Sequence, residues 1–155
     1  DGIKKGEIFG GKAKDLLDVL VSDFFVNIEM SLRIRKPKRY ICGVSLSGLF
    51  ALWASMKKGL FTGVASISGS FWYDGSTEWF SNQEHVYSDI FYFSLGEKEK
   101  DGKNARMAIV ETATLEVVES LKSRGKEVIF EMTEGGHFSA IAPRLESAIT
   151  TLLTP

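Results

Sequence analysis

Ser45 lies in the segment Gly43-Val44-Ser45-Leu46-Ser47-Gly48, between a short apolar run and a stretch with helical spacing. In a nucleophile elbow, a serine occupies a strained strand-to-helix turn, and the residues two positions before and after it must be small. Gly43 and Ser47 are small, although Ser47 stands where glycine is usual. We therefore predict that Ser45 is a nucleophile. The alternative is a small-residue turn that only packs the helix onto the sheet.

A serine hydroxyl is a poor nucleophile at neutral pH unless a general base lies within hydrogen-bond reach. The sequence holds two histidines. His137 follows Gly135-Gly136 directly after an apolar segment, where a flexible loop can carry the imidazole over the serine turn. His85 lies in a polar stretch with no predicted strand end beside it. We predict that His137 is the base and that His85 is an exposed loop residue.

The third member of a catalytic triad is an acid that orients the imidazole, and it lies between the serine and the histidine in chains with this kind of turn. The loop Leu95-Gly96-Glu97-Lys98-Glu99-Lys100-Asp101 occupies that position. We choose Glu99, with Glu97 and Asp101 as alternatives, and each of the three can instead be a solvated loop charge. The backbone N–H of Leu46 would donate to the oxyanion at the positive end of the following helix.

The elements that must position these residues alternate along the chain. Apolar runs over 40–44, 64–68, 90–95 and 128–132 are typical of strands buried on both faces of a parallel sheet. Helical spacing predicts helices near 12–31 after Gly10-Gly11, from the serine turn to Lys57-Lys58-Gly59, within 104–124 and over 140–153. This alternation predicts an α/β fold with helices around a parallel sheet, as one domain over residues 1–155.

The composition excludes several classes of partner. Lys and Arg total 19 against 20 Asp and Glu, and the net charge of -1 gives no reason to expect nucleic acid or an anionic membrane surface. No apolar run reaches the roughly 18 residues that cross a bilayer, and Asp1-Gly2-Ile3-Lys4-Lys5 does not look like a signal peptide, although an initiator Met is also absent. We expect no nucleic acid and no membrane as partner.

The single cysteine, Cys42, cannot form an intramolecular disulfide, which fits a reducing compartment and a cytoplasmic location. Its apolar neighbours predict that it packs in the core. Two distant histidines and one cysteine give no metal-ligand spacing. We therefore expect neither a metal nor an organic cofactor.

Four segments together are similar to the putative esterase family of α/β-hydrolases, which includes enterochelin esterase-like and S-formylglutathione hydrolase-like enzymes. These segments are residues 43–52, Ser68-Gly69-Ser70-Phe71-Trp72, Ser94-Leu95-Gly96-Glu97-Lys98-Glu99 and Gly135-Gly136-His137-Phe138. The resemblance covers essentially the whole chain. It implies a three-layer α/β-hydrolase fold and a carboxylic ester hydrolase that acts on a small-molecule ester through an acyl-serine intermediate. It also implies that Trp72 walls the substrate pocket, with a core or rim aromatic as the alternative.

Members of this family carry several strands before the serine turn, with a loop that gives the second oxyanion donor. Only one predicted helix precedes the turn here, so the resemblance implies the C-terminal portion of a larger domain. Strand 40–44 would then expose an unpaired edge. We expect association through that edge, for instance as a homo-oligomer, and poor activity of the 155-residue chain. Acyl transfer by the same triad and a non-catalytic binding module remain the alternative functions.

Overall fold

The computed structural model describes residues 11–57 and 59–154, and the chain forms two compact units, residues 1–37 and 38–155. In the first unit a continuous helical stretch consists of α1 (Ala13–Val19), a π-helical turn η1 (Leu20–Phe24) and α2 (Phe25–Ser31). This confirms the helix predicted near 12–31. Gly10, Lys58 and the segment Asp1 to Lys5, on which sequence-based expectations rested, lie outside the described residues. The prediction of one domain over residues 1–155 stays a prediction.

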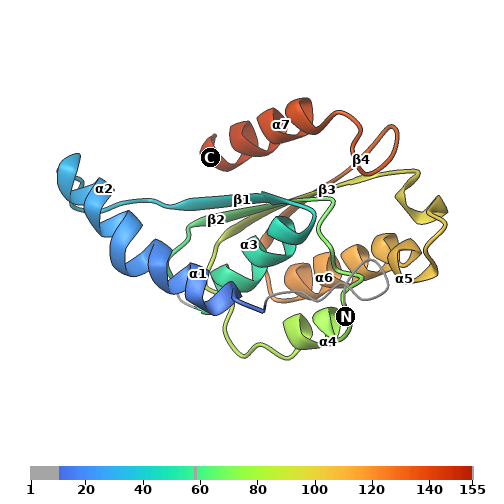
Figure 1. The fold of residues 1–155 in the computed structure, drawn as a ribbon, viewed down its shortest axis with the longest axis horizontal. Coiled ribbons are helices and arrows are strands. Elements are labelled where there is room, and N and C mark those ends of the chain that lie inside the picture. The colour runs from blue at the N-terminus through green and yellow to red at the C-terminus, as the bar shows by residue number, and fades with distance from the viewer. Residues whose placement is uncertain (1–10, 58, 155) are drawn as a thin grey trace. The chain divides into compact units, whose positions relative to one another are not determined.

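The second unit is built on a four-stranded parallel sheet in the order β1-β2-β3-β4 (Figure 1). Its strands are β1 (Tyr40–Val44), β2 (Gly63–Ile67), β3 (Ile90–Gly96) and β4 (Glu127–Thr133). The predicted strands agree with these bounds to within about one residue at each end. Because all four strands run in the same direction, their carboxyl ends meet at one edge of the sheet.

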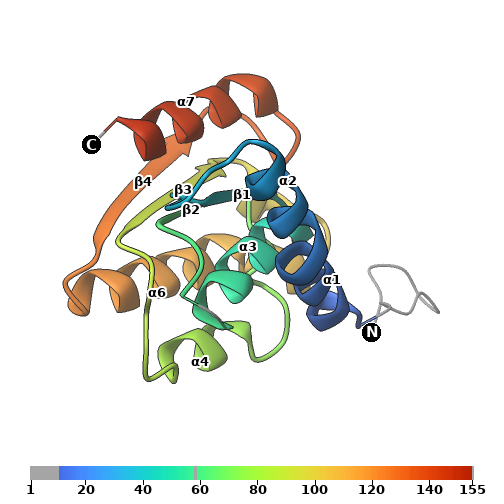
Figure 2. The same ribbon diagram turned by 90° about the vertical axis from the view of Figure 1, so that its left-hand side faces the viewer.

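Helices cover both faces of this sheet, which confirms the α/β-hydrolase-type layering (Figures 1 and 2). One face carries α3 (Leu46–Lys57), α4 (Ser76–Ser81), α5 (Ala105–Ala108) and α6 (Val110–Ser123), and the other carries α7 (Ile141–Leu153). The helix predicted within 104–124 is interrupted at Ile109, and α4 was not predicted. None of the helices in the described ranges has the length and apolarity that crossing a bilayer requires.

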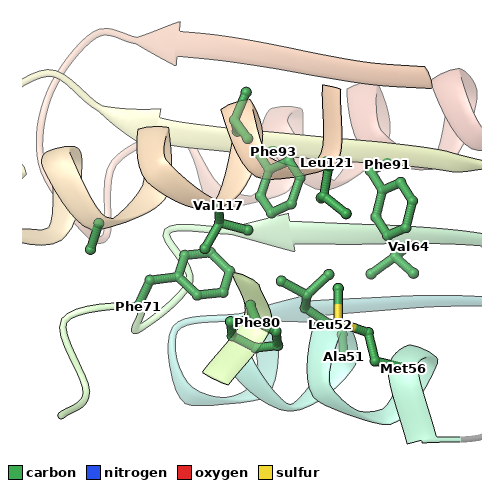
Figure 3. Packing of buried hydrophobic residues seen from close by; sticks show 12 residues of the cluster. Ala51, Leu52, Met56, Val64, Phe71, Phe80, Phe91, Phe93, Val117 and Leu121 are labelled. Atoms are coloured by element: carbon green, nitrogen blue, oxygen red, sulfur yellow. The ribbon is translucent and has the colours of Figure 1, made fainter. Parts of the chain in front are cut away.

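Side chains that alternate along the strands build a core on each face. On the side of α3 and α6 the core contains Ala51, Leu52, Met56, Val64, Phe71, Phe80, Phe91, Phe93, Ala113, Val117, Val118 and Leu121 (Figure 3). On the side of α7 it contains Ala65, Ile67, Tyr92, Ala148 and Leu152. The two central strands are therefore buried on both faces, as expected for a parallel sheet.

The outermost strand β1 differs from the prediction. It was expected to be buried on both faces, but its residues are mostly half-exposed, because β1 pairs only with β2 among the described strands. The prediction that Cys42 packs in the core is wrong, since Cys42 is exposed. Ile41 packs in the core on the α3 side, so the neighbouring Cys42 side chain lies on the α7 side of the sheet. Cys42 is exposed there because α7 lies mainly over β2 and β3. Association through the edge of β1 stays a prediction.

The helix α6 offers a matched test of this core. Leu121 is 2% exposed within the cluster, whereas Leu115 on the same helix is 38% exposed. We expect Leu121→Ala to lower the free energy of unfolding by about 2–5 kcal/mol, because it leaves a cavity among packed side chains. Leu115→Ala should change it by less than about 0.5 kcal/mol. Urea unfolding followed by circular dichroism measures both, and equal losses would contradict the burial of Leu121.

Candidate active site

The candidate residues lie on loops that leave the shared carboxyl edge of the sheet. Ser45 follows β1 directly, Ser68 follows β2, Glu99 lies in a short 3-10 turn (Glu99–Asp101) after β3, and His137 lies in the loop after β4. In open parallel sheets this edge is where ligands bind. The strand register therefore brings together residues that are distant in the sequence.

Ser45 occupies the turn between β1 and α3 with φ of 60°, a left-handed conformation that is unfavourable for a residue with a side chain. The turn is held by backbone hydrogen bonds: the Ser45 N–H donates to the carbonyl of Ile67 at 2.9 Å, and the Ser45 carbonyl accepts from the N–H of Gly48 at 3.0 Å. Position 43 must be glycine, because a Cβ there would lie 2.0 Å from the carbonyl oxygen of Ser47. The sequence thus fixes a strained serine at the sheet edge.

The structure brings Ser45, His137 and Glu99 together in one line of hydrogen bonds. His137 Nε2 lies 3.0 Å from Ser45 Oγ, and His137 Nδ1 lies 2.7 Å from Glu99 Oε2. Glu97 and Asp101, the alternative acids, are exposed, and Glu99 is the carboxylate that contacts the imidazole. The geometry therefore selects Glu99 among the three predicted acids as the partner of His137. His85 is exposed, as predicted.

The Glu99 carboxylate is buried, yet each of its oxygens accepts hydrogen bonds. Oε2 faces His137, and Oε1 accepts from the Gly96 N–H at 2.7 Å and from Ser68 Oγ at 2.5 Å. Burial on its own raises the pKa of Glu99, but the hydrogen bonds from His137, Ser68 and Gly96 outweigh it, so the pKa lies below its ordinary value. The site holds a charged carboxylate against the imidazole.

Four residues of this network were not given a role by sequence analysis. Arg144 on α7 donates from Nη2 to Ser68 Oγ at 2.7 Å and from Nε to Ser94 Oγ at 3.1 Å. The buried Ser70 places its Oγ 3.3 Å from Ser45 Oγ. A sequence signal existed for Arg144: it is a charged residue on the apolar face that Ile141 and Ala148 define in the last predicted helix. Ser68, Ser70 and Ser94 lie in two of the segments that carry the resemblance to the esterase family, and that resemblance is the signal that could have found them.

A pocket of about 280 Å³ opens beside the imidazole. His137, Glu99 and the buried Trp72 line it, together with Met107 and Val110. Trp72 lines this pocket, and its role as a wall of the substrate site stays a prediction. Leu46 is the first residue of α3, so its backbone N–H is one of those that a helix leaves without an intrahelical acceptor.

The described residues contain no group of three or more His, Cys, Asp or Glu side chains that could hold a metal ion. The expectation that the chain uses no metal and no organic cofactor stays a prediction.

Comparison with known proteins identifies the family of the chain. A family model described as "Putative esterase" matches residues 7–140. The chain belongs to this esterase family. It is 31% identical over 122 residues to the uncharacterized protein YbbA of Bacillus subtilis (strain 168), covering 76% of this chain and 48% of YbbA. The chain thus spans about half the length of the curated relative that it matches.

Solved structures with the same fold include esterases. The siderophore hydrolase EstA from Aspergillus nidulans superimposes with a TM-score of 0.74 at 20% identity, over 92% of this chain and 57% of EstA. The enterochelin esterase from Shigella flexneri gives a TM-score of 0.72 at 17% identity, over 91% of this chain and 37% of the enzyme. At these identities the likeness establishes that this member of the esterase family has the α/β-hydrolase fold.

The pKa of Glu99 predicts how stability depends on pH. Because the folded state holds this pKa below its ordinary value, ionised Glu99 contributes stability above the pKa of the unfolded chain, and the contribution is lost as pH falls through the folded pKa. Glu99→Gln should therefore destabilise the chain at pH 7, and the difference from the parent chain should shrink below about pH 5. Urea unfolding at several pH values measures this. Glu97→Gln, an exposed neighbour, should show no such trend, and a pH-independent loss in Glu99→Gln would contradict the prediction.

Proposed function

We propose that this chain carries the catalytic triad of a serine ester hydrolase, with Ser45 as the nucleophile, His137 as the general base and Glu99 as the acid. The observation that carries the proposal is the line of hydrogen bonds from Ser45 Oγ through the imidazole to the buried Glu99 carboxylate. Membership of the esterase family supports ester hydrolysis as the reaction. The left-handed turn at Ser45 supports its identity as a nucleophile elbow.

In the proposed reaction Ser45 Oγ attacks the ester carbonyl while its proton moves to His137 Nε2. The tetrahedral intermediate carries its negative charge on the former carbonyl oxygen, to which the N–H of Leu46 donates. The intermediate collapses, the imidazolium gives its proton to the leaving alcohol, and an acyl-serine remains. Water then attacks the acyl group with His137 again as base, and the carboxylic acid leaves. Throughout, Glu99 accepts a hydrogen bond from the Nδ1–H of His137, which keeps that proton on Nδ1 and leaves Nε2 free to take the serine proton.

The substrate that we propose is a small-molecule ester with an apolar portion. The apolar part of the pocket beside His137 is formed by Trp72, Met107 and Val110, whose side chains are suited to such a group, and the polar residues Lys98, Lys103 and Asn104 also line it. Solved structures with this fold are named as a siderophore hydrolase, an enterochelin esterase and a ferulic acid esterase, which supports an ester as the scissile group. The pocket in turn supports Trp72 as a wall of the substrate site.

Ser45→Ala tests the nucleophile. It should lower kcat/KM for p-nitrophenyl acetate by about three orders of magnitude or more, because it removes the oxygen that lies against His137 Nε2. A fluorophosphonate probe, followed by peptide mass spectrometry, should label Ser45 in the parent chain. Ser123→Ala, on an exposed helix end, is the control and should keep full labelling. A chain that folds but takes up no probe would favour a non-catalytic binding module instead.

The acid is tested by three single exchanges in one loop. Glu99→Gln should lower kcat by about 10²- to 10⁴-fold, since the amide cannot hold the imidazole in the required tautomer. Glu97→Gln and Asp101→Asn should stay close to the parent rate, because both side chains are exposed. Steady-state kinetics on the three variants decides between them. Small and equal losses would mean that the site works as a Ser-His dyad or that the acid lies elsewhere.

A further inference from the structure

Arg144 is the buried charge that the proposed reaction does not use. It is 3% exposed, and it lies on the face of α7 that packs against the sheet. Its Nε and Nη2 donate to the hydroxyls of Ser94 and Ser68, but its buried Nη1 has no hydrogen-bond partner among the residues that the structure describes. An apolar side chain would fill this position without the cost of desolvating a cation. The guanidinium therefore needs an explanation beyond packing.

Ser68 connects this cation to the candidate site. Its Oγ accepts from Arg144 Nη2 at 2.7 Å and donates to Glu99 Oε1 at 2.5 Å. A hydroxyl has one proton, so a donor on its lone-pair side turns that proton toward the remaining acceptor. Arg144 thereby fixes the direction in which the Ser68 hydroxyl points. Its Nη2 also lies 4.0 Å from Glu99 Oε1, which places a positive charge behind the carboxylate.

The buried backbone of Ser68 fixes the hydrogen bonds that run from Arg144 through Ser68 to Glu99. Ser68 is fully buried and has φ of 48°, so its backbone is held in the left-handed region directly after β2. Its N–H donates to the carbonyl of Ser94 at 2.7 Å, and the hydroxyl of the same Ser94 accepts from Arg144. Arg144 is thus attached to the ends of two neighbouring strands at once. The carboxylate is supported from the opposite face of the sheet to that of α3.

We propose that Arg144 is a positioning residue that, through Ser68, holds the Glu99 carboxylate in the orientation that the His137 imidazole requires. The expected effect of Arg144 on kcat rests on the proposed triad, whereas its expected effect on the orientation of Glu99 and the tautomer of His137 does not. Arg144 touches no reacting atom. It acts on the acid, the acid fixes the tautomer of the base, and the base sets the rate.

The kinetic test compares Arg144→Met with Arg144→Lys. Arg144→Met keeps an apolar stem of similar length, and it should lower kcat for p-nitrophenyl acetate by about 10- to 100-fold with little change in KM, because a misaligned acid affects the transition state and not substrate binding. Arg144→Lys keeps the cation and a donor for Ser68, and it should recover a large part of the loss. Arg124→Met is the matched control, since Arg124 binds the backbone carbonyls of Gln83 and Ser81 away from the site.

A spectroscopic test needs no catalytic activity. His85→Gln leaves His137 as the one imidazole of the chain, so its ring ¹⁵N shifts are assigned directly. The parent should hold one tautomer, with the proton on Nδ1, and Arg144→Met should show a mixture, whereas Arg124→Met should not. If ester hydrolysis and labelling of Ser45 fail but the tautomer still responds to Arg144, the proposed function is wrong and the positioning role stands.

Ser68→Ala is a second test of the same link for the case that Arg144→Met does not fold, because it removes only one oxygen atom. It should lower kcat and mix the tautomers, as Arg144→Met does, and Arg144→Met should lower kcat little further in the Ser68→Ala background, because both residues act through the same link. A folded Arg144→Met chain with the parent kcat and a single tautomer would overturn the proposal. Additive losses in the Ser68 and Arg144 double variant would overturn the route through Ser68.

Discussion

The arrangement of the site depends on one requirement, a carboxylate that stays charged although it is buried. Removing the Glu99 charge from water is costly, and hydrogen bonds to the charged form offset that cost. The donors come from separate places in the chain: the Gly96 N–H at the end of β3, the Ser68 hydroxyl after β2 and His137 after β4. They meet because three parallel strands end side by side. The register of the sheet therefore determines where the hydrogen-bond donors lie around the Glu99 carboxylate.

The loops that carry acid and base are joined by backbone as well as by side chains. The N–H of Lys98 donates to the Gly135 carbonyl at 3.0 Å, and the Glu97 N–H donates to the Thr133 carbonyl at 2.9 Å. Gly96 allows this approach, because a Cβ there would lie 2.6 Å from the Gly135 carbonyl oxygen. Main-chain contacts thus hold the two loops side by side, and side-chain hydrogen bonds then orient the carboxylate toward the imidazole.

Sequence patterns predicted the parts of this site whose chemistry is local. Ser45 is predicted because a strained turn demands small neighbours, and His137 is predicted because it follows a strand and two glycines. The sequence leaves Glu97 and Asp101 as alternatives to Glu99, since alternation along a charged loop does not say which carboxylate turns inward. Cys42 was misplaced because an apolar run does not reveal whether its strand is central or outermost. Whether a strand is central or outermost depends on which strands pair, and the residues of an apolar run do not reveal that pairing.

Sequence analysis gave Arg144 no role, and the packing of α7 explains why. Helical periodicity assigns Ile141, Ala148 and Leu152 to the face of α7 that packs on the sheet, and Arg144 shares that face. A charge is unfavourable in an apolar core, so a charged residue is tolerated on this face only where polar groups lie within hydrogen-bond distance. Those groups are the hydroxyls of Ser68 and Ser94, which lie at the ends of β2 and β3. The helix that closes one core therefore also reaches the acid, and the packing of α7 and the orientation of Glu99 cannot vary independently.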